Sequence, residues 1–131
     1  MFKRIDHVEI VTDKLEPTIA FYTDVLGFTV GRRDRLPQAD SDAVLHVAYL
    51  GLGGTTIELI TYDNVPVAPE PKREHLGYRM MALEVEDMKA ALAYLEAKGV
   101  KAAWGPVFRE DYARAEIEDP NGYRIELRHW F

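Results

Sequence analysis

The chain has no cysteine among its 131 residues. Disulfide bonds and thiolate zinc sites are therefore excluded, and the sequence gives no information about a redox compartment. It also lacks any apolar run approaching the roughly 20 residues that a membrane-spanning helix needs. The N-terminus MFKRIDH lacks the apolar segment of a signal peptide. We therefore expect a cytoplasmic protein with no membrane partner.

Basic residues are in deficit, with 16 lysines and arginines against 22 aspartates and glutamates, and the formal net charge is -6. Because nucleic-acid-binding surfaces need clustered positive charge, this balance argues against a nucleic-acid partner. The hydrophobic share of 47% and the charged share of 29% are ordinary for a globular protein. A chain of this length can form one domain with a substantial core, or two small modules side by side.

The first half of the chain reads as one strand, one helix and three further strands. RIDHVEIVT alternates in polarity, as a half-buried strand does. DKLEPTIAFYTDVLGF then has helical spacing of its apolar residues Leu15, Ile19, Tyr22 and Leu26. Gly27 suits the position just after the end of that helix. The strand candidates FTVGRR, AVLHVAYL and TTIELITY follow.

The same order recurs after a proline-bearing segment at residues 63 to 77, which we interpret as a connecting loop. RMMALEV is a strand candidate, EDMKAALAYLEAKGV a helix, and KAAWGPVFR, ARAEIED and YRIELRHW are strand candidates. Aligning the two helix starts places Met80 opposite His7, and the endings TIEL and RIEL place Glu58 opposite Glu126. The sequence thus predicts a single α+β domain made of two βαβββ modules, residues 1 to 62 and 76 to 131.

Alternation also assigns faces to the strands. Val8 and Ile10 would pack beneath the helix, which turns His7 to the opposite face of the sheet with Glu9 nearby. By the same reasoning this opposite face carries Glu58, Met80, Glu84 and Glu126. If the sheets curve, the face becomes a cleft holding one imidazole and two carboxylates, which are ligands for Zn, Ni, Co, Mn or Fe ions. The alternative is a solvated sheet face without metal, and the equivalent places of the two glutamates in the repeats argue against it.

Three segments, DHVEIVTDKLEPTIAFYTDVLGF, GGTTIELI and EDPNGYRIEL, together resemble the glyoxalase / bleomycin-resistance / extradiol-dioxygenase (vicinal oxygen chelate) superfamily. They are most similar to glyoxalase I-like members. The resemblance covers nearly the whole chain, from Ile5 to Leu127. It implies two modules whose sheets curl round a cleft, and a homodimer in which modules from different subunits complete each site.

The resemblance further implies a metal site, whose positions fall on His7, Glu58, Met80 and Glu126. Lyase-type members usually have a histidine at the position of Met80, and a thioether is a poor ligand for a hard divalent ion. His75 lies an odd number of residues upstream, so in a regular strand it would point to the other face. We therefore predict one divalent ion (Ni, Zn, Mn, Co or Fe) bound by His7, Glu58 and Glu126.

Four further residues are candidates for the substrate pocket: Met80, His46, Glu84 and Trp104. Each has a plain structural alternative. A strand histidine such as His46 is more often a satisfied structural residue, and an aromatic residue such as Trp104 more often packs in a core.

The sequence leaves three functions open. The first is a metal-dependent lyase or isomerase for a small substrate with vicinal oxygens, in which Glu126 or Glu58 moves a proton next to a carbonyl. The second is a metal-free protein that sequesters a drug or metabolite, which the acidic balance and the missing fourth ligand would suit. The third is an extradiol dioxygenase, which needs two histidines and one carboxylate on iron. The three matching ligand residues, His7, Glu58 and Glu126, favour the first.

Overall fold

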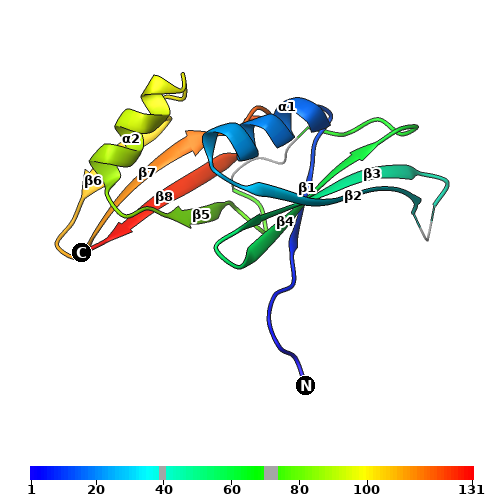
Figure 1. Cartoon of the computed structure of the whole chain (residues 1–131), viewed down its shortest axis with the longest axis horizontal. Helices are drawn as coiled ribbons and strands as arrows, with labels where there is room; N and C mark the ends of the chain where they lie inside the picture. Colours follow the sequence, from blue (N-terminus) through cyan, green and yellow to red (C-terminus); the bar gives the residue numbers. More distant parts are fainter. Residues whose placement is uncertain (39–40, 70–73) are drawn as a thin grey trace. The chain divides into compact units, whose positions relative to one another are not determined.

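The structure, a computed structural model, describes residues 1–38, 41–69 and 74–131. The chain divides into two compact units, Met1–Pro69 and Glu70–Phe131. Each unit has a four-stranded sheet and a helix, coloured blue to green in the first and green to red in the second (Figure 1). Residues 70–73 of the predicted connecting loop lie outside the described residues. No helix in the described ranges is long and apolar enough to cross a membrane.

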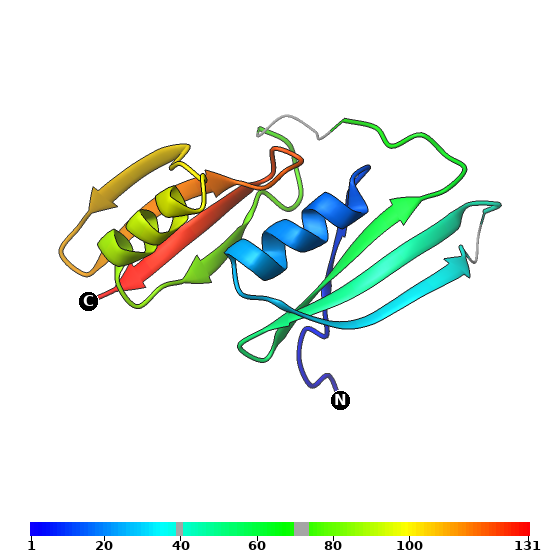
Figure 2. The same ribbon diagram turned by 45° about the horizontal axis from the view of Figure 1, so that its top comes forward.

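The first unit follows the predicted order of one strand, one helix and three strands. Its elements are β1 (Val8–Val11), α1 (Leu15–Ala20), the π-helical turn η1 (Phe21–Val25), β2 (Thr29–Pro37), β3 (Val44–Leu52) and β4 (Thr55–Tyr62). The strands lie in the order β1-β4-β3-β2, and β1 runs parallel to β4 while the other neighbours are antiparallel. Helix α1 lies over one face of this sheet (Figure 2).

The predicted first helix forms as α1 and η1, and Gly27 ends it. Gly27 has a φ of 77°, a left-handed conformation that glycine adopts without steric cost. The amide of Phe28 then donates a hydrogen bond of 2.9 Å to the carbonyl of Tyr22, which closes the last turn. Both rings are buried and meet edge to face at 5.4 Å. The turn chemistry therefore anchors the helix to the core.

The core of the first unit lies on the helix-covered face of the sheet. Leu50 lies opposite Ile57 in the register of β3 and β4, and Ala48 lies opposite Leu59. All four side chains are buried. Val8 was expected to share this face, but it is 41% exposed because β1 is an edge strand with a neighbour on one side only. The residues between these apolar positions point to the opposite, open face.

The second unit repeats the arrangement with β5 (Met81–Glu84), α2 (Met88–Ala97), β6 (Trp104–Phe108), β7 (Tyr112–Glu118) and β8 (Arg124–Trp130). Its strand order is β5-β8-β7-β6, with β5 parallel to β8. The buried residues Met88, Leu95, Ile117, Ile125 and Leu127 form its core. The predicted α+β fold of two βαβββ modules is confirmed.

Strand register confirms the predicted equivalence of the two glutamates. Glu9 lies opposite Glu58 across β1 and β4, and Ala82 lies opposite Glu126 across β5 and β8. Glu58 and Glu126 therefore hold the same position in the two sheets. Counting back two residues along each first strand makes Met80 the counterpart of His7, as the sequence alignment of the repeats predicts.

Helix α2 depends on a side-chain cap at its start. The carboxylate of Asp87 accepts a hydrogen bond of 2.7 Å from the amide of Ala90. We expect Asp87→Ala to lower the free energy of unfolding by about 1 kcal/mol, because that amide loses its partner. The exposed neighbour Glu86 provides the control. Glu86→Ala should change the free energy of unfolding by less than about 0.5 kcal/mol. Urea unfolding followed by circular dichroism measures both, and equal effects would contradict the cap.

Candidate metal-binding site

The open face of the first sheet brings together residues from three strands. Glu58 of β4 lies between Glu9 of β1 and Tyr49 of β3. Directly paired residues of neighbouring strands point to the same face, so these three side chains share the open one. His7 precedes β1, which starts at Val8, and is two residues from Glu9. Its side chain therefore points the same way.

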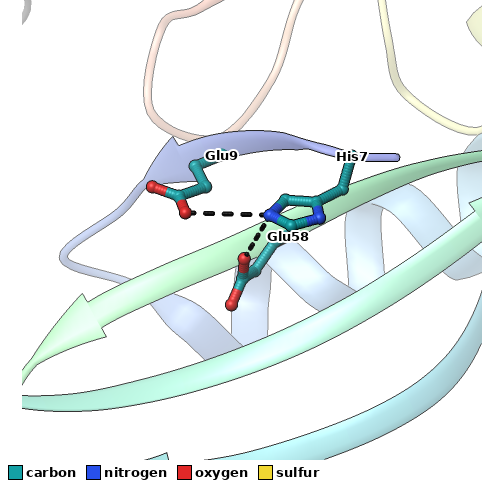
Figure 3. Close-up of side chains that lie close together, drawn as sticks. All are labelled: His7, Glu9 and Glu58. Carbon is teal, nitrogen blue, oxygen red and sulfur yellow. Dashed lines mark ion pairs between the residues drawn. The ribbon is translucent and has the colours of Figure 1, made fainter. Parts of the chain in front are cut away.

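One nitrogen of the His7 imidazole faces the carboxylates of both Glu58 and Glu9 (Figure 3). Its Nε2 is 3.1 Å from Oε2 of Glu58 and 3.7 Å from Oε1 of Glu9. Glu58 is only 6% exposed, whereas Glu9 is an exposed residue. A buried carboxylate is costly without a partner, and His7 supplies one here.

Two further contacts hold this arrangement in place. Nδ1 of His7 is 3.1 Å from Oδ2 of Asp6, and this hydrogen bond is the main reason why the pKa of His7 is raised. Tyr49 is hydrogen-bonded to the Glu58 carboxylate, which raises the pKa of the tyrosine. The rings of His7 and Tyr49 also meet edge to face at 5.8 Å. Asp6 thus turns Nε2 of His7 towards the carboxylates, and Tyr49 orients Glu58.

A cleft of about 380 Å³ in the first unit is lined at one end by His7, Glu9, Tyr49 and Glu58. The rest of the cleft is lined mainly by apolar and aromatic side chains, namely Leu36, Leu45, Val47, Ile60 and Tyr62, with Gln38. Its volume falls within the usual range for small-molecule sites of about 300 to 1,000 Å³. A polar cluster at one end of an apolar cleft is a typical layout for binding and orienting a small ligand.

The donor set fits a divalent metal ion. His7, Glu9 and Glu58 each offer one ligand atom, and these three atoms lie within 4.8 Å of one another. One imidazole nitrogen and two carboxylate oxygens suit Zn, Mn, Fe, Co or Ni. The Asp6 contact adds the carboxylate that commonly orients a metal-bound histidine through its other nitrogen.

Glu126, the third predicted ligand, has a different environment in the second unit. Its Oε2 is 3.0 Å from Nη2 of Arg114, and its Oε1 accepts a hydrogen bond of 2.8 Å from Nε of Arg128. Glu126 is 8% exposed, so both guanidinium groups serve to balance a buried charge. Both of its carboxylate oxygens are engaged by arginines.

Of the pocket candidates of the second unit, Trp104 and Glu84 lie beside these two arginines. Trp104 is 43% exposed and its ring stacks with the guanidinium of Arg114 at 4.8 Å. Glu84 lies opposite Arg128 in the register of β5 and β8. Met80 precedes β5, and its sulfur is 4.0 Å from Nη1 of Arg79.

The remaining pocket candidate, His46, lies away from the cleft. Its neighbours Leu45 and Val47 line the cleft, so alternation turns His46 to the other face of β3. There its Nε2 is 2.7 Å from Oδ1 of Asp63. The structural alternative for a strand histidine describes it better than the pocket role.

Strand alternation placed Glu9 near the site without giving it a role, and Tyr49 was not among the predicted site residues. The signal for Glu9 was its spacing of two residues from His7 in an alternating strand. Tyr49 had no such signal, because AVLHVAYL is apolar on both faces and its register with Glu58 comes only from the sheet.

Comparison with known proteins places the chain among similar sequences and folds. Residues 4–127 match the family model described as Glyoxalase/Bleomycin resistance protein/Dioxygenase superfamily. The chain is 31% identical over 131 residues to the uncharacterized protein YaeR of Escherichia coli (strain K12), with 95% of each chain covered. It is 30% identical over 126 residues to lactoylglutathione lyase of Salmonella typhimurium, with 95% of this chain and 90% of that one covered. A glyoxalase family protein from Bacillus cereus aligns with a TM-score of 0.85 over 100% of this chain and 96% of its own, at 21% identity, which indicates a shared fold.

Proposed function

Because the chain belongs to the Glyoxalase/Bleomycin resistance protein/Dioxygenase superfamily, we propose that it is a glyoxalase I-like lyase or isomerase that depends on a divalent metal ion. The observation that carries the proposal is the 3.1 Å contact between Nε2 of His7 and the buried carboxylate of Glu58. The relative from Salmonella typhimurium, named lactoylglutathione lyase, supports the same class of reaction.

The substrate class is a small molecule with two neighbouring oxygens, such as the thiohemiacetal of an α-ketoaldehyde and a thiol. A divalent ion at His7 and Glu58 would supply Lewis-acid polarisation of those oxygens. A carboxylate would take the proton from the carbon that bears sulfur and hydroxyl, and return it to the adjacent carbon. The product is a hydroxy thioester with the same atoms as the substrate.

The residues have separate tasks in this reaction. Asp6 keeps the His7 ring turned towards the site, and Tyr49 holds the Glu58 carboxylate by a hydrogen bond. Glu58 is our first candidate for the proton transfer, because it is buried beside His7 and faces the cleft. The roles predicted for Glu126, as ligand or proton carrier, stay predictions. So do the cytoplasmic location and the homodimer, in which a partner copy would complete the site.

Turnover tests the proposal directly. The protein should be stripped with a chelator and reloaded with Ni, Co, Mn, Zn or Fe(II), and then supplied with the thiohemiacetal of methylglyoxal and glutathione. We expect thioester formation only after reloading, and a loss of about a hundredfold or more in kcat for Glu58→Gln, because the amide cannot accept the proton. The substitution Glu16→Gln, which removes an exposed carboxylate of α1, is the control and should keep wild-type kcat.

Binding without chemistry is the second candidate, and the apolar part of the cleft favours it. Leu36, Leu45, Val47 and Ile60 would hold an apolar drug or metabolite with no need of a metal. If none of the five ions produces turnover in folded protein, the binding function replaces the enzyme. An extradiol dioxygenase has less support, because the cluster has one histidine and two carboxylates rather than two histidines and one carboxylate.

A further inference from the structure

The two open sheet faces differ sharply in the charge that surrounds their equivalent glutamates. In the second unit, Arg114 and Arg128 each contact one oxygen of Glu126. In the part of the chain that the structure describes, the ion-pair contacts of Glu58 and Glu9 both run to His7. Glu126 is thus paired with two guanidinium groups, whereas Glu58 and Glu9 face a single imidazole.

The arginines at Glu126 are themselves fixed in position. The guanidinium of Arg128 stacks over Tyr112 at 4.5 Å and over Trp130 at 4.9 Å. That of Arg114 stacks over Trp104 at 4.8 Å and also contacts Glu116 at 3.1 Å. Because guanidinium groups stay protonated, they repel a divalent ion at short range. A metal ion at Glu126 would have to displace two stacked, ion-paired side chains.

The first unit has the opposite arrangement. Nε2 of His7 faces both Glu58 and Glu9, and Glu9 occupies the place held by Ala82 in the second unit. The second unit therefore has a thioether at Met80 and a neutralised carboxylate at Glu126, while the first has one carboxylate beyond the predicted set. The additional carboxylate of Glu9 thus compensates for the carboxylate of Glu126 that the arginines occupy.

We propose that Glu9, and not Glu126, is the third protein ligand of the metal ion. The ion is held by the first unit alone, through Nε2 of His7 and one oxygen each of Glu58 and Glu9. Glu126 anchors Arg114 and Arg128 on the face of the second sheet. This inference rests on the metal binding of the proposed function, and it explains why a methionine at position 80 is compatible with such a site.

Metal affinity of the full chain tests the inference without any measurement of activity. Ni²⁺ and Co²⁺ are titrated against a chromophoric chelator, for the wild type and for Glu9→Gln and Glu126→Gln. We expect Glu9→Gln to weaken binding by about tenfold or more, and Glu126→Gln to stay within about threefold of the wild type. The visible spectrum of bound Co²⁺ should change only for Glu9→Gln, because only there does the ligand set change.

The control is Asp13→Asn, which removes an exposed negative charge close to β1. It should leave affinity within about threefold of the wild type. Glu9 is exposed, so its variant is expected to fold. If Glu9→Gln binds as tightly as the wild type, if Asp13→Asn loses as much, or if Glu126→Gln loses more, Glu9 is not the ligand while the proposed function stands. If the wild type binds none of these ions, the proposed function fails first.

Discussion

Replacing His7 with alanine should remove most of the rise in melting temperature that divalent ions produce in the wild type. At an ion concentration one hundred times the Kd, binding stabilises the folded chain by about 2.7 kcal/mol. If the loss of Nε2 weakens binding a hundredfold, the same concentration stabilises the variant by only about 0.4 kcal/mol. Differential scanning calorimetry with Ni, Co, Mn and Zn measures the difference.

When a chelator removes all metal ions, His7→Ala should still be less stable than the wild type. His7 is the ion-pair partner of Glu58, which is 6% exposed, and without it the buried carboxylate keeps Tyr49 as its neighbour. We expect a loss of about 1 to 3 kcal/mol. A histidine on a solvated sheet face would change the stability by no more than about 0.5 kcal/mol. The two expectations do not overlap.

His46→Ala is the matched control in the same unit. This histidine also contacts a carboxylate, Oδ1 of Asp63 at 2.7 Å, but both side chains are more than a third exposed, at 37% and 35%. We expect a cost of about 0 to 1 kcal/mol and an unchanged response to metal ions. If His7→Ala keeps the wild-type response, or His46→Ala loses it, the metal site does not lie at His7.

Much of the first site followed from one rule, the alternation of side chains along a strand. His7 and Glu9 share a face because they are two residues apart, and the repeat alignment identified Glu58 and Glu126 as equivalents. These predictions needed only local periodicity and the order of elements. The same rule, applied to AVLHVAYL, would have placed His46 on the face opposite to Val47, but both faces of that strand are apolar and neither was assigned.

The alternation rule alone could not predict the charge partners of Glu126. Arg128 is two residues from Glu126 on the same strand, so its proximity was visible. Arg114 comes from β7, and it approaches Glu126 only because the β7–β8 register pairs Arg114 with Arg128. A one-residue shift in that pairing would turn Arg114 to the other face. Register depends on the whole sheet, and a carboxylate's charge partners depend on register.

Gly105→Ala should be among the most destabilising single substitutions in the second unit. Gly105 has a φ of +83°, and a methyl group there would lie 2.9 Å from the carbonyl oxygen of Arg114 and 3.1 Å from Cα of Ala115. The left-handed backbone alone costs a non-glycine residue about 1 to 2 kcal/mol. Pushing β6 off the backbone of β7 adds a further penalty of about 1 to 3 kcal/mol.

Gly99→Ala separates the two contributions, because Gly99 has nearly the same φ, +81°, and a methyl group there meets no heavy atom of the described residues within 4 Å. We expect Gly99→Ala to lower the free energy of unfolding only by the cost of the left-handed backbone conformation, about 1 to 2 kcal/mol. Urea unfolding measures the loss in free energy of unfolding for both variants. Equal losses would show that β6 moves away from β7 without a further energetic penalty. The backbone of Arg114 is the point of contact, so Gly105→Ala should also separate Trp104 from the Arg114 guanidinium, now 4.8 Å from the ring centre. A change in tryptophan fluorescence for Gly105→Ala, absent from Gly99→Ala, would link the β6–β7 contact to the arginine that holds Glu126.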